Sequence, residues 1–295
     1  MQRFLLLGLF GLVAQFIDGS LGMAYGVTAT TMLLAGGVAP AMASASVHLA
    51  EVGTTLASGL SHWKLGNTEW RAVGWMAVPG GIGAFTGAIL LTSISAEVAS
   101  RWIAAFLICL GVYILLRFTF GAYRLRSGRR IRGRYLAPLG LGAGFLDAAG
   151  GGGWGPIATP TLLASGRMEP RKVVGTVDTS EFLVSLGASA GFLFGLNRAE
   201  IPFTTVAALL LGGVIAAPFA AWLVRIMHPR LLGAGVGGLI IFTNSRTLLK
   251  AAGYDADARY LLLTCLALLW LGAVALAAQA VLGERAQRQA SATGD

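Results

Sequence analysis

The sequence predicts an all-α integral membrane protein with two inverted repeats, each a broken, re-entrant helical pair plus three transmembrane helices, and one extra C-terminal transmembrane helix. Three observations predict this fold: the composition, the recurrence of long apolar segments, and a match between the two halves of the chain. Of 295 residues, 56% are hydrophobic and 12% are charged, whereas about a quarter of the residues in a soluble domain are charged. The mean hydropathy is +0.73.

Apolar segments of transmembrane length recur along the whole chain. A helix of about 20 apolar residues crosses the hydrocarbon core of a bilayer, which is about 30 Å thick. The expected spans cover residues 41–60, 72–91, 102–120, 173–196, 203–224, 231–249 and 261–282. These spans leave no room for a soluble domain. The apolar start of the chain lacks the small-residue cleavage site of a secretory signal, so we expect it to remain in the mature protein.

The second half of the chain repeats the first. Aligning Gly11 with Gly140 places "QFIDGSLGMAYG", residues 15–26, on "GFLDAAGGGGWG", residues 144–155. One added residue carries the match onward, and the later pairs are Pro40 with Pro170, Ser46 with Thr176, His48 with Asp178, Glu51 with Glu181 and Asn67 with Asn197. A duplication of this length predicts membrane repeats at residues 1–120 and 136–250, joined by an Arg-rich cytoplasmic linker at 121–135. Residues 251–295 form the additional transmembrane helix and a polar tail.

Basic residues indicate which way each repeat faces. Seven arginines crowd the link between the halves, with no acidic residue between Arg101 and Asp147: Arg117, Arg124, Arg126, Arg129, Arg130, Arg132 and Arg134. The positive-inside rule places this link, and the basic C-terminal tail, in the cytoplasm. The other basic connections between helices also lie in the cytoplasm only if residues 4–36 and 136–166 each enter and leave the membrane on the same side. Each repeat then has three full spans, and this odd number inverts the second repeat relative to the first. If each segment crosses once instead, the repeats are parallel and Arg167, Arg171 and Lys172 lie outside.

The glycine-rich breaks are the first candidate for a binding site. Each glycine in a helix costs about 1 kcal/mol relative to alanine, and unwound backbone survives at membrane depth only where protein or a polar cavity surrounds it. Free N–H groups at the restart of a helix favour anions. The alternative is that the glycines only let helices pack closely. A nucleotide site is excluded because no Gly-Lys-Ser/Thr motif follows a strand.

Ionisable residues within the spans are the second candidate, because acids inside a membrane are expensive and usually functional. Asp18 and Asp147 precede the breaks, so they either cap freed N–H groups or accept protons. Glu51 and Glu181 occupy matching positions, and each follows a polar residue three positions earlier on the same helical face. Arg246 either snorkels to the interface or offers a fixed cation to an anion.

The candidate site therefore combines both sets of residues. The substrate-binding candidates are Gly22, Tyr25, Gly26, Ser46, His48, Gly151, Gly152, Gly153, Trp154, Gly155, Thr176, Thr179 and Arg246. The candidates for proton coupling or gating are Asp18, Glu51, Asp147, Asp178 and Glu181. No catalytic residue, metal ligand or cofactor is expected: the chain lacks HExxH, and Cys109 and Cys265 are isolated residues in apolar helices.

Several of these motifs resemble the TauE/SafE family of membrane permeases. They are the N-terminal break, "GLGAGFLDAAGGGGWGPIATPTLL", "VGTVDTSEF" and the basic central loop. The resemblance implies a secondary transporter of the bacterial inner membrane that exports sulfite or short organosulfonates such as sulfoacetate, with proton coupling as an option. The expected partners are this small anion and the lipid bilayer, with no nucleic acid, and no oligomeric state is predicted. The alternatives are an anion channel and a carrier for a different small anion.

Overall fold

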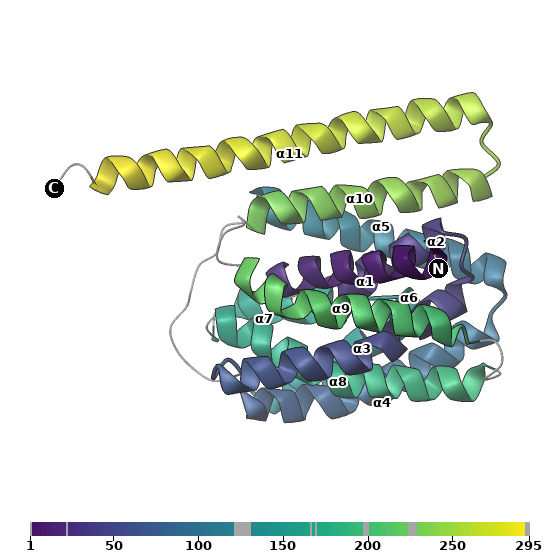
Figure 1. The fold of residues 1–295 in the computed structure, drawn as a ribbon, viewed down its shortest axis with the longest axis horizontal. Helices are drawn as coiled ribbons and strands as arrows, with labels where there is room; N and C mark the ends of the chain where they lie inside the picture. The colour runs from purple at the N-terminus through teal and green to yellow at the C-terminus, as the bar shows by residue number, and fades with distance from the viewer. Residues whose placement is uncertain are drawn as a thin grey trace.

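The computed structural model describes residues 2–21, 23–120, 131–165, 167–168, 170–196, 201–223 and 229–292. Every regular element in these ranges is a helix, and the helices lie side by side in a bundle (Figure 1). This arrangement confirms the predicted all-helical class. Four of the seven linker arginines, Arg124, Arg126, Arg129 and Arg130, lie outside the described residues.

The segment predicted as the first repeat contains one broken helix and three long ones. Its helices are α1 (Gln2–Leu21), α2 (Tyr25–Ala35), α3 (Pro40–Lys64), α4 (Trp70–Ser93) and α5 (Ala96–Phe120). The break between α1 and α2 falls at the first predicted site. The expected spans at 41–60, 72–91 and 102–120 lie within α3, α4 and α5.

The second repeat has the same order of short and long helices. Its helices are α6 (Gly133–Gly150), α7 (Trp154–Ser165), α8 (Pro170–Gly195), α9 (Phe203–Leu223) and α10 (Pro229–Ala251). The chain ends with α11 (Ala256–Ala292), which contacts α10 and α5 along one side of the bundle and extends beyond it (Figure 1). The first helix of this repeat begins at Gly133, within the segment expected to be linker.

The two halves of the chain interlock instead of forming separate bundles. α1 packs on α9, and its counterpart α6 packs on α4. α3 packs on α8, and α5 packs on α10. The contacts of α6 with α4 bring backbones together, because a Cβ on Gly140 or Gly144 would collide with the main chain of Met76 or Gly80. Small residues allow this close approach of membrane helices.

Three described helices, α4, α5 and α11, are long and apolar enough to cross a membrane by length and composition alone. The helices at the centre of the bundle carry more polar residues, which the surrounding helices cover. The strongest example is α3, whose buried residues include Ser44, His48, Glu51 and Thr54. A buried polar face on a central helix is a common feature of membrane proteins that handle polar ligands.

A cavity of about 200 Å³ lies where the ends of several helices come together. It is lined by Ile131 and Leu136 at the start of α6, by Arg167, Met168 and Lys172 between α7 and α8, and by Glu69, Arg71 and Ala72 at the start of α4. The chain therefore enters α6 and leaves α7 at the same end of the bundle. This end, which we call the linker end, is also where α3 connects to α4.

Candidate functional site

The site begins with two interruptions in the helical backbone. Between α1 and α2, Ala24 adopts a φ of 102°, the one positive φ among the described non-glycine residues. Between α6 and α7, Gly151 and Gly152 have φ values of 73° and 133°. Glycine adopts such values without the steric penalty that a Cβ atom imposes. The glycine run therefore allows the chain to leave one helix and begin the next.

The two interruptions cross each other in contact. A Cβ atom on Gly26 would lie 2.9 Å from the Cα of Gly152 and 3.2 Å from Oε1 of Glu51. A Cβ on Gly155 would lie 2.8 Å from the Cα of Met23. Real Cβ atoms do not approach other atoms this closely, so the crossing requires glycine at both positions. The predicted residues Gly26, Gly151, Gly152 and Gly155 meet at this crossing.

Both aspartates next to the breaks cap the restarting helices. Oδ1 of Asp147 accepts hydrogen bonds from the N–H groups of Gly153, at 2.7 Å, and Trp154, at 2.9 Å. Oδ1 of Asp18 accepts one from the N–H of Tyr25 at 3.1 Å. Capping was one of the two roles expected from the sequence. It also means that a protein carboxylate already occupies the N–H groups of Gly153 and Trp154 that we expected to face an anion.

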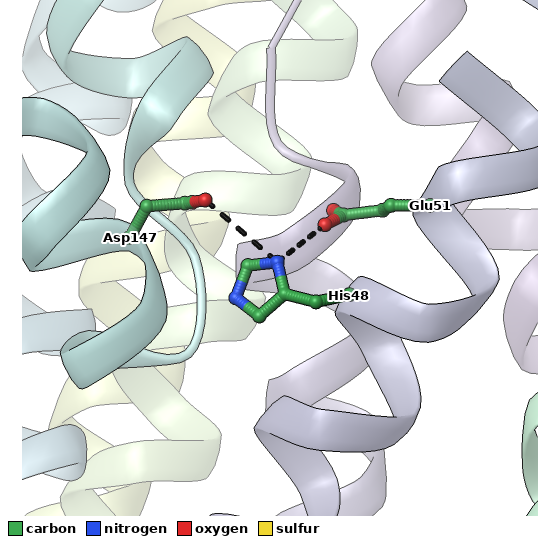
Figure 2. A group of neighbouring side chains, drawn as sticks. All are labelled: His48, Glu51 and Asp147. Atoms are coloured by element: carbon green, nitrogen blue, oxygen red, sulfur yellow. Dashed lines mark hydrogen bonds and ion pairs between the residues drawn. The ribbon is translucent and has the colours of Figure 1, made fainter. Parts of the chain in front are cut away.

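Asp147 also joins a buried cluster with two residues of α3, His48 and Glu51 (Figure 2). Nδ1 of His48 lies 2.8 Å from Oε2 of Glu51 and 3.7 Å from Oδ2 of Asp147. All three side chains are at most 2% exposed. The three residues form what we call the central triad, and they connect a long helix of repeat 1 with the glycine break of repeat 2.

The central triad has unused binding capacity. Nε2 of His48, Oε1 of Glu51 and Oδ2 of Asp147 are buried and have no hydrogen-bond partner. Unpaired buried polar atoms are rare because each one costs about 1–3 kcal/mol. One nitrogen and two carboxylate oxygens of the triad lie within 4.8 Å of one another, which is close enough to hold a metal ion, a proton or part of a small ligand. Phe192 covers the imidazole of His48, with ring centroids 6.0 Å apart.

Two further buried acids, Asp18 and Glu181, interact electrostatically with the triad, and a third, Asp178, interacts with both of them. Asp18 interacts with Asp178 and Glu51, and Glu181 interacts with Glu51, Asp18, Asp147 and Asp178. All five carboxylates are at most 8% exposed, and the buried residues of the described part include no lysine or arginine to neutralise them. The centre of the protein is therefore acidic, with His48 as its buried basic group.

Other predicted site residues have structural partners instead. Thr176 Oγ1 accepts a hydrogen bond from the N–H of Glu69 at 3.0 Å, and Thr179 Oγ1 lies 3.2 Å from Thr68 Oγ1. These two hydroxyls hold the connection between α3 and α4. Ser46 donates to the carbonyl of Met42 one turn earlier on its own helix. Gly22 lies outside the described residues.

The aromatic and basic candidates differ in position. Trp154 is fully buried, and its Nε1 donates to the carbonyl of Val177 at 3.1 Å. Tyr25, its match in repeat 1, points its hydroxyl at the carbonyl of Leu209, 3.4 Å away. Arg246 is exposed and lines a cavity of about 550 Å³ at the end of α10, together with Arg101 and Lys250. The arginine is therefore a candidate for a vestibule and not for the buried core.

Sequence reasoning missed His62, whose Nε2 lies 3.9 Å from Oδ2 of Asp178. A signal was present: His48, Glu51, Thr55, Ser58 and His62 are spaced by three or four positions. Residues at this spacing share one face of a helix. The polar face of α3 therefore extends from the triad to the last turn of the helix.

The comparisons with known proteins show the family of the chain. Residues 7–247 match the family described as Sulfite exporter TauE/SafE. The chain is 49% identical over 277 residues to the Probable membrane transporter protein YtnM of Bacillus subtilis (strain 168), which covers 93% of this chain and 92% of that relative. No solved structure matches the chain. The chain has a polar centre where two glycine-containing breaks cross inside an apolar bundle, and a transporter family matches nearly its whole length. The chain is therefore a multi-pass membrane transport protein of the TauE/SafE family and not an enzyme.

Proposed function

We propose that this protein is a secondary carrier that exports sulfite or short organosulfonates such as sulfoacetate across the bacterial inner membrane, coupled to protons. The observation that carries the proposal is the contact between Gly26 and Gly152, where both broken helices cross beside Glu51. In secondary transporters, broken helices commonly meet at the substrate site near the middle of the membrane. The name of the matched family supports a sulfur oxyanion as the substrate.

The charge of the centre supports proton coupling. An anion that reaches the glycine crossing meets Glu51, Asp147 and the neighbouring acids, with His48 as the buried basic group. Two like charges in a poorly solvated site repel strongly. The anion therefore binds best when these carboxyls hold protons, and by linkage the bound anion favours proton uptake to the same extent. In this scheme Glu51, Glu181, Asp18, Asp147 and Asp178 carry or gate the protons.

The substrate then contacts the backbone of the crossing and the triad. Gly26, Gly151, Gly152 and Gly155 provide a surface without side chains, and His48 supplies a cation when it is protonated. Arg101, Arg246 and Lys250 line a cavity at one end of the bundle that also contains Glu97, the ion-pair partner of Arg101, so this vestibule is basic on balance. Arg71, Arg167 and Lys172 form another at the linker end. Export occurs when the outward gradient of the anion exceeds the opposing proton gradient.

We also infer that the two repeats are inverted, with the linker and the C-terminus in the cytoplasm. The support is that α6 and α7 begin and end at the linker end, so this pair does not cross the bundle. Three full helices then remain in each repeat, and an odd number inverts the second copy. The reciprocal packing of α1 on α9 and α6 on α4 is the pattern that such a two-fold relation produces.

Uptake of radiolabelled sulfite into proteoliposomes tests this function. We expect saturable uptake that an inward proton gradient stimulates, that unlabelled sulfoacetate inhibits, and that unlabelled sulfite inside the vesicles accelerates by exchange. Taurine, sulfate and chloride serve as competitors of different charge and shape, and empty liposomes are the control. Flux that neither saturates nor exchanges indicates a channel. No uptake by correctly folded protein contradicts the sulfur-anion assignment.

A further inference from the structure

We propose that the polar face of α3 is a proton path between the acidic centre and the linker end, with His62 as the group that exchanges protons with the aqueous side. The inference rests on the proposed proton coupling and adds a residue that coupling requires. The path runs along Glu51, Thr55, Ser58 and His62, and Asp178 of α8 contacts it from the side.

The outer end of the path is defined by atomic contacts. Nε2 of His62 lies 3.9 Å from Oδ2 of Asp178, and its Nδ1 lies 3.5 Å from Nδ2 of Asn67. The side chain of Ser58, one turn before His62 on α3, also interacts with the carboxylate of Asp178. Of the other charged groups near this end of α3, Lys64 lies two residues further along the helix and is exposed. A histidine placed in this way can take a proton at one ring nitrogen and release it at the other.

Exposure falls steadily from the surface to the centre. The side chain of His62 is 25% exposed, that of Asp178 is 8% exposed and that of Glu51 is 1% exposed. Asp178 interacts electrostatically with Asp18 and Glu181, and Glu181 interacts with Glu51. Glu51 in turn contacts His48 at 2.8 Å. Electrostatic interactions among buried acids therefore connect the partly exposed pair of His62 and Asp178 with the central triad.

The second repeat lacks the equivalent outer group. In the alignment that pairs Glu51 with Glu181, His62 falls on Phe192, which stacks on the ring of His48. The polar face of α8 continues from Glu181 only through Ser185 and Ser189, which are buried and whose hydroxyls have no partner. A phenyl ring carries no exchangeable proton. Of these two matched faces, both within the described residues, that of α3 alone carries a titratable side chain beyond the matched glutamate, and it leads to the linker end.

The test separates proton movement from substrate binding in reconstituted full-length protein. His62→Gln removes titration but keeps a polar side chain, and Ser61→Ala changes the exposed neighbour as a matched control. Exchange of labelled for unlabelled sulfite at equal pH measures the substrate site. A pH-sensitive dye inside the vesicles measures the protons that accompany net sulfite uptake. We expect His62→Gln to slow proton-coupled uptake about tenfold or more while exchange stays within about twofold of wild type.

Each outcome decides a different claim. Unchanged coupled uptake in both His62→Gln and Asp178→Asn overturns the path and leaves the proposed function intact. Equal losses of exchange and coupled uptake in His62→Gln, with the protein folded, also overturn it, because His62 would then serve the substrate site or the overall structure. A wild-type protein whose net sulfite uptake moves no protons contradicts the proposed coupling, and the path with it.

Discussion

Nδ1 of His48 lies 3.7 Å from Oδ2 of Asp147, although the two residues belong to different repeats. The same aspartate uses its other oxygen, Oδ1, to accept hydrogen bonds from Gly153 and Trp154. One carboxylate therefore holds the glycine break of repeat 2 and faces the basic group of repeat 1. Its structural role and its electrostatic role can be separated by substitution.

Asp147→Asn keeps an oxygen for the two N–H groups but removes the charge that faces His48. We expect this variant to fold with nearly wild-type stability and to lose proton-coupled uptake. Asp147→Ala also removes the cap, and the loss of a helix cap typically costs about 0.5–2 kcal/mol. Thermal unfolding in detergent checks the difference. Equal unfolding temperatures for the two variants would contradict the capping role.

Gly152→Ala tests the crossing of the two breaks. Gly152 has a φ of 133°, and a Cβ there would collide with the backbone of Gly26 and Val27. We expect a loss of about 1–3 kcal/mol from strain alone, together with loss of sulfite exchange. Gly142→Ala is the matched control, because this glycine lies in α6 with no atom within 4 Å of an added Cβ. Wild-type exchange in Gly152→Ala would show that the crossing tolerates a side chain.

Neutralising either matched glutamate should uncouple transport from the proton gradient. Glu51→Gln and Glu181→Gln remove a titratable group from the acidic centre while keeping the size of the side chain. We expect gradient-driven uptake to fall by at least about tenfold, with the unfolding temperature unchanged or raised because repulsion among the acids is relieved. Unchanged gradient-driven uptake in both variants would refute their role in coupling.

The orientation of the repeats can be measured by labelling single cysteines from one side of the membrane. Cys109 and Cys265 are free and are first replaced by serine. We expect Leu65→Cys and Arg167→Cys to react with an impermeant thiol reagent from the same side, and Tyr254→Cys from the opposite side. All three positions are exposed. Labelling of Leu65→Cys and Arg167→Cys from opposite sides would support parallel repeats instead.

Much of the backbone could be predicted because its causes are local. Long apolar segments form helices. The separated glycines around Gly22 and the glycine run at 150–153 mark the breaks. Capping by Asp18 and Asp147 was one of the two roles expected from the sequence, because a carboxylate beside a break can accept the N–H groups that the break frees. Each aspartate lies seven residues before the first residue of the helix it caps. Asp147 and the N–H groups that donate to it are close in the sequence, so this contact could be predicted.

The partners of side chains on different helices could not be predicted, since they depend on how the repeats interlock. No pattern in α3 reveals that Asp147 of α6 approaches His48. Thr176 and Thr179 have the right chemistry for a site, but they lie near the start of α8, where they bond to Glu69 and Thr68. Trp154 was a substrate-binding candidate, and the structure buries it completely against α4 and α8.

The most direct test of the account is the pH dependence of anion binding to the purified wild-type protein. Sulfoacetate is the suitable probe, because its two acidic groups stay ionised between neutral and mildly acidic pH, so a change in affinity reports on the protein. If the anion binds beside acids that must hold protons, its Kd falls as the pH falls. Equilibrium binding that tightens steadily toward acidic pH is the predicted result. A Kd that is independent of pH, or that rises at acidic pH, would contradict proton-coupled anion transport through this centre.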